Sequence, residues 1–181
     1  QDRVWGIEWD RVVFLNLSPE HMDYHPTLEH YFNAKALLFT QHLDYSRSMG
    51  KKPIGFSNAS SPYGKKLLDQ VINLQAYSVT DDINNLVNTP SGIAAEVKVN
   101  YEWYGLECPL FGAFQIENIL AALNIGASLG VENFWACLKS FPGVPGRMES
   151  IPNKNGIFVF VDYAHKPEAL EKVLLSIQGK K

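Results

Sequence analysis

Four side chains that can bind a metal ion lie within one short polar segment: Glu20, His21, Asp23 and His25. Carboxylate oxygens suit magnesium, whereas two histidines and a carboxylate suit zinc or iron equally well. A solvated loop with one capping aspartate has the same composition. The residue types therefore leave three interpretations open: a magnesium site, a transition-metal site and an ordinary surface loop.

Lys35 is the second candidate for chemistry, because its neighbours at helical spacing are all apolar or aromatic. These neighbours are Tyr31, Phe32, Leu38 and Phe39. An ammonium group is costly to remove from water, so a lysine in an apolar stripe needs a partner or a chemical conversion. The other interpretation is that the stem of Lys35 is buried while its amine reaches solvent. The spacing leaves both open.

A buried strand and a helix are predicted to position these residues. The nearly continuous apolar run Trp9–Leu17 ends at Ser18-Pro19, which is typical of a strand in a parallel sheet. Thr27 fits the N-cap of an amphipathic helix over about 28–48. The polar segment therefore follows the carboxyl end of a strand, which is where open α/β sheets bind ligands.

The rest of the chain predicts an α/β fold with a mainly parallel sheet flanked by helices. The alternation from Ile93 to Trp103 adds a small antiparallel hairpin region, packed against the main sheet. Further strands are expected at 52–57, 77–80 and 156–161, and further helices after Pro62, at 113–130, at 132–140 and after Pro167. The polar cluster Asp162, Tyr163 and His165 follows the expected buried strand at 156–161.

The composition argues against several classes of protein. With 181 residues and 46% hydrophobic side chains, the chain can bury one ordinary core. Its 16 Lys and Arg against 19 Asp and Glu form no basic stripe, so neither nucleic acid nor an anionic membrane is an expected partner. No apolar run approaches the roughly 20 residues of a membrane-spanning helix. Cys108 and Cys137, without CxxC spacing, fit a reducing, cytoplasmic setting.

The polar segment and Lys35 together resemble the Mur ligases, the ATP-dependent ligases of peptidoglycan synthesis, and most of all their MurE branch. NLSPEHMDYH, followed by Ala34-Lys35, is similar to the family's Asn-Leu strand end, Asp-His-Leu-Asp-Tyr-His motif and Ala-Lys pair. The resemblance implies that His21 binds Mg²⁺. It also implies that Lys35 is carbamylated, so that a carboxylate faces the metal during catalysis. Glu20 departs from the family's aspartate.

Three later segments resemble the family's nucleotide-binding elements. GAFQIENILAA is similar to Gly-x-x-Asn-x-x-Asn-x-x-Ala-Ala, PGRMES to Gly-Arg-Met-Glu, and DYAHKP to Asp-Tyr-Ala-His-x-Pro. The resemblance implies that ATP contacts Asn118 with its adenine, Arg147 with its phosphates and Asp162 with its ribose, while His165 lines the same site. Gln115 stands where the family has its first asparagine.

The resemblance also implies a place for this chain within a longer protein. Gln1 and Arg3 match positions that help to bind a UDP-muramoyl dipeptide. The family's phosphate-binding P-loop and its C-terminal domain have no counterpart in the sequence. We therefore expect residues 1–163 to be the C-terminal portion of the central ATP-binding domain, and residues 164–181 to be a linker and first helix toward the C-terminal ligase domain.

The implied reaction joins an amino acid, the third residue of the stem peptide, to UDP-MurNAc-L-Ala-D-Glu through an acyl phosphate made from ATP. Without a P-loop, the 181-residue chain alone is expected to be inactive. Another Mur ligase or a folylpolyglutamate synthase remains an alternative, although Tyr24-His25 favours the MurE branch. A metal hydrolase using the histidines of the polar segment and a non-catalytic module are further alternatives. The sequence does not distinguish diaminopimelate from lysine as the added amino acid.

Overall fold

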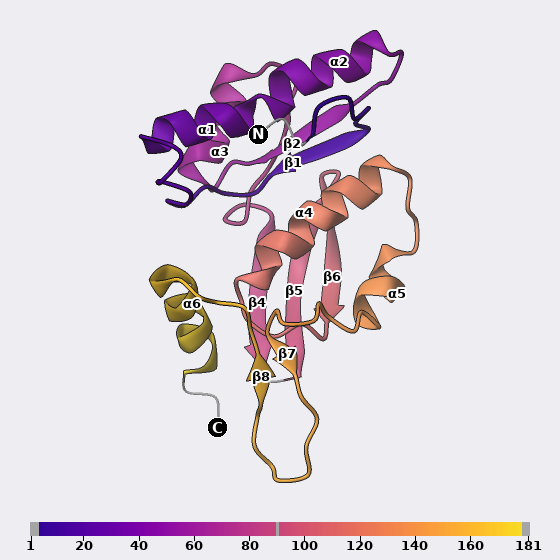
Figure 1. The fold of residues 1–181 in the computed structure, drawn as a ribbon. Helices are drawn as coiled ribbons and strands as arrows, with labels where there is room; N and C mark the ends of the chain where they lie inside the picture. Colours follow the sequence, from indigo (N-terminus) through magenta and orange to yellow (C-terminus); the bar gives the residue numbers. More distant parts are fainter. Residues whose placement is uncertain (1–3, 90, 179–181) are drawn as a thin grey trace. The chain divides into compact units, whose positions relative to one another are not determined.

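The computed structural model describes residues 4–89 and 91–178, apart from the side chain of Glu168. The chain forms two compact units, Gln1–Thr80 and Asp81–Lys181, each with its own sheet and helices (Figure 1). The boundary predicted between residues 163 and 164 concerns the domains of a longer protein and stays a prediction. No helix in the part of the chain that the structure describes is long and apolar enough to span a bilayer.

The first unit is built on a three-stranded parallel sheet. Its strands pair in the order β1 (Arg11–Phe14), β2 (Ile54–Asn58) and β3 (Gln75–Tyr77). Val12 lies opposite Gly55, and Phe56 lies opposite Gln75. The expected parallel strands are therefore confirmed, although β1 is shorter than predicted and β3 lies earlier in the chain.

Helices pack on this parallel sheet and close the first core. They are α1 (Leu28–Ala36), the π-helical turn η1 (Leu38–His42), α2 (Leu43–Ser48) and α3 (Pro62–Gln70). The side chain of Thr27 caps α1 by accepting a hydrogen bond from the backbone N–H of His30 at 3.0 Å. The helix predicted over 28–48 is thus interrupted by a wider turn. The buried cluster consists of Val12, Phe14, Phe32, Phe39, Leu43 and Leu67.

The second unit contains an antiparallel sheet with the order β4 (Ile83–Thr89), β5 (Gly92–Val99) and β6 (Glu102–Cys108). Every second side chain of β5 is buried, as its alternating sequence predicts. The predicted hairpin is therefore confirmed as β5 and β6, but it belongs to a sheet of the second unit with β4 as third strand. Strand β4 was missed because its side chains are mostly exposed and show no apolar alternation.

Helix α4 (Gln115–Ser128) packs on β5 and carries the residues that matter for the site (Figure 1). It ends as the sequence predicts, at a glycine. Gly130 has φ +73°, a conformation that glycine adopts without steric cost. The N–H of Val131 donates to the carbonyl of Gly126 at 3.0 Å, which closes the last turn. A short helix, α5 (Phe134–Lys139), follows as expected.

The strand predicted at 156–161 is largely wrong. The segment forms only β8 (Phe160–Val161), which pairs antiparallel with β7 (Glu149–Ser150). Ile157 and Phe158 are 58% and 56% exposed, so this run is not a buried parallel strand. The physical reason is that a short apolar run has no period that separates a buried strand from the arm of a hairpin. The expected last helix, α6 (Pro167–Ile177), does form.

Candidate functional site

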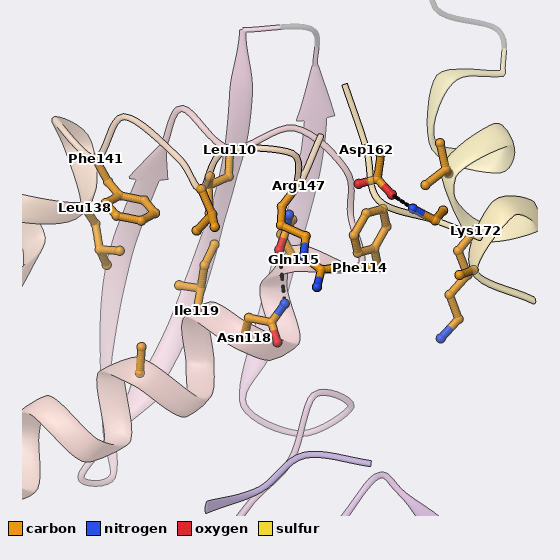
Figure 2. A pocket seen from close by; sticks show the side chains of 15 residues that line it. Leu110, Phe114, Gln115, Asn118, Ile119, Leu138, Phe141, Arg147, Asp162 and Lys172 are labelled. Carbon is orange, nitrogen blue, oxygen red and sulfur yellow. Dashed lines mark hydrogen bonds between the residues drawn. The ribbon is translucent and has the colours of Figure 1, made fainter. Parts of the chain in front are cut away.

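A cavity of about 690 Å³ lies in the second unit, between α4, α5, α6 and the connecting loops (Figure 2). This volume is in the range of sites for small molecules and cofactors. Most of its wall is apolar. Its apolar side chains include Leu110, Phe114, Ile119, Leu138, Phe141 and Val144, and its polar side chains are Gln115, Asn118, Arg147, Asp162 and Lys172.

Helix α4 contributes two carboxamides that bind each other. The Nδ2 atom of Asn118 donates a hydrogen bond to the Oε1 atom of Gln115 at 3.0 Å. The two residues are three positions apart, so their side chains lie on the same face of the helix. Gln115 is buried, whereas Asn118 is exposed. The pair thus joins a fixed residue to one that a ligand can reach.

Asp162 is anchored by two backbone amides. Its Oδ2 atom accepts from the N–H of Met148 at 2.8 Å, and its Oδ1 atom accepts from the N–H of Ala164 at 2.7 Å. Each carboxylate oxygen has a second lone pair, so the group retains the capacity to accept a hydrogen bond from a ligand hydroxyl. The carboxylate is therefore held in place at the cavity and still able to bind.

Backbone contacts bring the PGRMES and DYAHKP segments together. The N–H of Tyr163 donates to the carbonyl of Gly146 at 2.8 Å, and the N–H of Gly146 donates to the carboxylate of Glu149 at 2.8 Å. The guanidinium carbon of Arg147 lies 5.4 Å from the centroid of the Tyr163 ring, within the range of a cation–π contact. These contacts explain how Arg147 and Asp162, which are distant in sequence, line one cavity.

Of the four residues predicted to bind the nucleotide, three line this cavity, and His165 is not among its lining residues. The His165 side chain is exposed, with Nδ1 2.9 Å from the carbonyl oxygen of Tyr163. Sequence reasoning missed Lys172, which lines the cavity from α6. Ala169, Lys172 and Val173 all line it. Their spacing of three and four residues marks one helical face, but the sequence does not state that this face meets a ligand.

In the first unit, Lys35 reaches solvent, which is one of the two interpretations that its spacing left open. Lys35 is exposed, and its Nζ atom lies 4.8 Å from the centroid of the Tyr31 ring. The buried stripe of these helices runs through Phe32, Phe39 and Leu43 with Ala36 packed against it, and Lys35 lies beside this stripe. Lys35 instead lines a cavity of about 450 Å³, together with residues that include Phe14, Asn16, Leu38 and His42. Its predicted carbamylation stays a prediction.

His21 lies on the loop before α1 in a strained backbone conformation. Its φ is +55°, which is uncommon for a residue with a side chain and is found more often at functional sites. The His21 side chain is 64% exposed, and its Nε2 atom lies 3.9 Å from the Glu20 carboxylate. Its ring packs edge-on against Tyr31 at 6.1 Å, so Tyr31 contacts both His21 and Lys35.

The polar segment does not converge on one point. Among residues 4–89 and 91–178, no group of three or more His, Cys, Asp or Glu side chains could hold a metal ion. His25 is buried and turns toward His30, with 2.7 Å between their Nδ1 atoms. Burial, with the charges of His30 and His21 nearby, lowers the pKa of His25. Within the described residues, His21, Asp23 and His25 therefore do not form one metal-binding group.

The predicted substrate-binding residues Gln1 and Arg3 lie outside the described residues. Their proposed role is therefore carried by the sequence resemblance alone.

The chain is similar in sequence and in fold to known ligases. The sequence profile of the Mur ligase middle domain matches residues 1–126. The UDP-N-acetylmuramoyl-L-alanyl-D-glutamate--2,6-diaminopimelate ligase of Thermosynechococcus vestitus is 38% identical over 184 residues, covering 96% of this chain and 36% of that protein. A solved structure of an enzyme with the same name has a TM-score of 0.76 and 28% identity, covering 98% of this chain and 37% of the other.

A more distant structure shows the same fold. The MurF ligase from Thermotoga maritima, solved in complex with ADP, has a TM-score of 0.77 at 20% identity, covering 93% of this chain and 39% of the other. The α/β fold expected from the sequence is therefore confirmed. The chain spans somewhat more than a third of the length of these relatives, at 36% to 39% of each.

Proposed function

This chain belongs to the Mur ligase middle-domain family, and from that premise we propose that its second unit forms the adenine-nucleotide site of an ATP-dependent ligase. One observation carries the proposal: Asn118, Arg147 and Asp162, which come from three separate segments, line a single cavity. The cavity size and its mostly apolar wall suit a planar base. The ADP bound in the MurF structure belongs to that protein and supports the extension to this chain.

The polar groups of the cavity match the other parts of a nucleotide. The Asp162 carboxylate can accept a hydrogen bond from a ribose hydroxyl, because each of its oxygens has a second lone pair. Arg147 is suited to phosphate oxygens, since a guanidinium presents several donors in one plane. Lys172 adds a second cation at the cavity. His165 is proposed for the outer part of this site, where a ligand can reach its exposed ring.

For the parent protein, we propose the reaction named for the relatives. ATP transfers a phosphoryl group to a carboxylate of the D-Glu residue of UDP-MurNAc-L-Ala-D-Glu and leaves as ADP. An amine of diaminopimelate then attacks the acyl phosphate, phosphate leaves, and the amine loses a proton to give the amide. The relative with 38% identity is named for diaminopimelate, which favours this amino acid over lysine. Gln1 and Arg3 are proposed to bind the UDP-muramoyl dipeptide. A cytoplasmic location follows from the use of ATP as a co-substrate.

The first unit is proposed to supply the metal side of the same reaction. Mg²⁺ prefers oxygen ligands, and His21 and Lys35 offer only an imidazole and an amine. Addition of carbon dioxide to the neutral amine of Lys35, with loss of a proton, would supply a carboxylate. The exposure of Lys35 leaves its amine accessible to this addition. The described residues do not by themselves form a complete magnesium site, so no step of the reaction is assigned to the metal.

Calorimetry of ADP binding by the parent protein tests the nucleotide site. Arg147→Ala should weaken ADP binding by about 10- to 100-fold, because a hydrogen bond to a charged group contributes about 1.5–3 kcal/mol. The matched control is Arg47→Ala, which removes an exposed arginine of the first unit that pairs with Asp44. No ADP binding by the wild-type protein, or equal binding by wild type and Arg147→Ala, would contradict the proposed site.

A further inference from the structure

Two histidines of the first unit face each other at the start of α1, and the proposed ligase reaction uses neither of them. The Nδ1 atom of His25 lies 2.7 Å from the Nδ1 atom of His30. His30 belongs to the first turn of α1, where its backbone N–H donates to the side chain of Thr27 at 3.0 Å. His25 lies on the loop before that turn. The pair therefore joins the polar segment to the helix.

The surroundings fix one imidazole and leave the other able to adjust. His25 is 8% exposed, and its ring contacts those of Tyr24 and Tyr31, with 4.9 Å and 4.8 Å between centroids. Its backbone N–H donates to the carbonyl of His21 at 2.8 Å. His30, in contrast, is exposed. A ligand that reaches the pair from solvent therefore meets one fixed nitrogen and one that can shift toward it.

Two facing imidazole nitrogens can bind a metal ion in place of their shared proton. The hydrogen bond between the rings uses a proton on one of the two Nδ1 atoms. When that ring carries its proton on Nε2 instead, the lone pairs of both Nδ1 atoms are available. A neutral imidazole is the commonest metal ligand among protein side chains, through either ring nitrogen. The exchange needs no change in the charge of either ring.

The separation of the two nitrogens indicates which ions fit best. Bonds from an imidazole to a metal ion are about 2.0–2.1 Å long. Two such nitrogens at a right angle on one ion therefore lie about 2.9 Å apart, and at the tetrahedral angle about 3.3 Å apart. The observed 2.7 Å is closer to the right-angle value. Right angles occur in the square-planar and tetragonal sites of Cu²⁺ and Ni²⁺, whereas Zn²⁺ favours the tetrahedron.

We propose that His25 and His30 form a two-nitrogen site for Cu²⁺ or Ni²⁺, with water at the remaining coordination positions. Among the described residues, no group of three or more His, Cys, Asp or Glu side chains could hold a metal ion, so the pair supplies the protein ligands alone. The site is separate from the proposed magnesium site, because Mg²⁺ prefers oxygen ligands. A bound ion would link the loop that carries His21 to the first turn of α1.

Calorimetry of Ni²⁺ binding by the parent protein, without a polyhistidine tag and in excess Mg²⁺, tests the pair. His30→Gln should weaken Ni²⁺ binding at least about tenfold, because a chelate with two linked ligands becomes a site with one. Glutamine is well accommodated at the third position of a helix, so the variant should fold, and circular dichroism establishes this. In the wild type, Cu²⁺ should bind more tightly than Ni²⁺, and Co²⁺ more weakly.

The matched control is His165→Gln, which removes an exposed histidine of the second unit and should bind Ni²⁺ like the wild type. Four outcomes overturn the proposed metal site: no Ni²⁺ binding by the wild type, equal binding by wild type and His30→Gln, displacement of Ni²⁺ by Mg²⁺, or loss of Ni²⁺ binding in His21→Gln alone. ADP binding, measured on the same samples, decides the proposed nucleotide site separately, since no residue of that cavity belongs to the pair.

Discussion

The two units hold their candidate residues in different ways. In the second unit, Asn118, Arg147 and Asp162 converge on one mostly apolar cavity. In the first unit, Lys35 lines a cavity from an exposed position, and His21 lies on an exposed loop and packs against Tyr31. Converging polar groups in a cavity form a binding site by themselves, whereas an exposed imidazole and amine need oxygen ligands from elsewhere to bind magnesium. The difference predicts unequal responses to mutation.

The largest expected effect is in the first unit, where replacement of Lys35 tests whether its amine is converted to a carbamate. In the parent protein, Lys35→Ala should lower kcat for ligation at least about 100-fold, because it removes a charged group proposed to stabilise the transferring phosphoryl group. Short carboxylic acids should partly restore the rate by supplying the missing anion. Product formation from UDP-MurNAc-L-Ala-D-Glu, diaminopimelate and ATP measures both effects.

The control for Lys35 is Lys65→Ala, which removes an exposed lysine of α3 in the same unit. ADP binding should be unchanged in both variants, since the nucleotide cavity is lined by residues of the second unit. Full ligase activity of Lys35→Ala would exclude the carbamate. Lys35 would then have no catalytic role, and the two units would differ because only the second contains functional residues among those tested.

The second prediction concerns Asp162, which combines a structural and a binding role. Asp162→Asn replaces one carboxylate oxygen by an amide nitrogen, so the N–H of either Met148 or Ala164 loses its acceptor. Since Met148 is buried, the free energy of unfolding of the second unit should fall by about 1–3 kcal/mol. Denaturant unfolding of the 181-residue chain measures this loss. Asp69→Asn, an exposed residue of α3, is the control. Equal stability of the two variants would show that the amides do not depend on Asp162.

Much of the second unit was predictable because its signals are local. The helical period and the stop at Gly130 predicted α4, and Asn118 lies within that helix. The positions of Arg147 and Asp162 at the cavity agree with the family motifs, although the strand expected before Asp162 is mostly an exposed loop. Asp162 therefore lines the cavity although the strand expected before it forms only at Phe160–Val161.

The features that sequence reasoning missed depend on non-local geometry. The π turn after α1 is one such feature, because a regular helical period contains no sign of it. The bond from Asn118 to Gln115 depends on side-chain rotamers. Lys172 lines the cavity because α6 presents one face to it, and a helical sequence does not state which face meets a ligand.

The third prediction tests Lys172 as a second cation of the cavity. Lys172→Met should weaken ADP binding by the parent protein by about two- to fivefold, since the lysine is exposed and its attraction for phosphate is screened by water. The loss should shrink at high salt. Calorimetry at low and high ionic strength measures both effects, with Lys154→Met as the control from the exposed loop between β7 and β8. A loss that does not change with salt would point to packing of the lysine stem instead of charge.

The smallest expected effect concerns the ion pair between α5, which lines the cavity, and strand β6. Lys139 of α5 lies 2.8 Å from the Glu107 carboxylate of β6, and the neighbouring Leu138 lines the cavity. The hydrogen bond and charge of Lys139 lower the pKa of Glu107 from its ordinary 4.5, and the same contacts with Glu107 raise the pKa of Lys139 from 10.5. The pair should therefore stabilise the second unit at pH values between these two ordinary pKa values. Its contribution is lost as the pH falls through the lowered pKa of Glu107 or rises through the raised pKa of Lys139.

Thermal unfolding of Lys139→Met tests this pair against the wild-type chain. The variant should unfold at a slightly lower temperature at pH 7 and low salt, and the difference should vanish when Glu107 is protonated in strong acid. Both side chains are mostly exposed, so high salt should also remove most of the difference. Lys154→Met should show no such dependence on pH. A difference in unfolding temperature that persists in acid would mean that the stem of Lys139, rather than its charge, holds α5 against β6. The packing of α5 at the cavity would then not depend on pH.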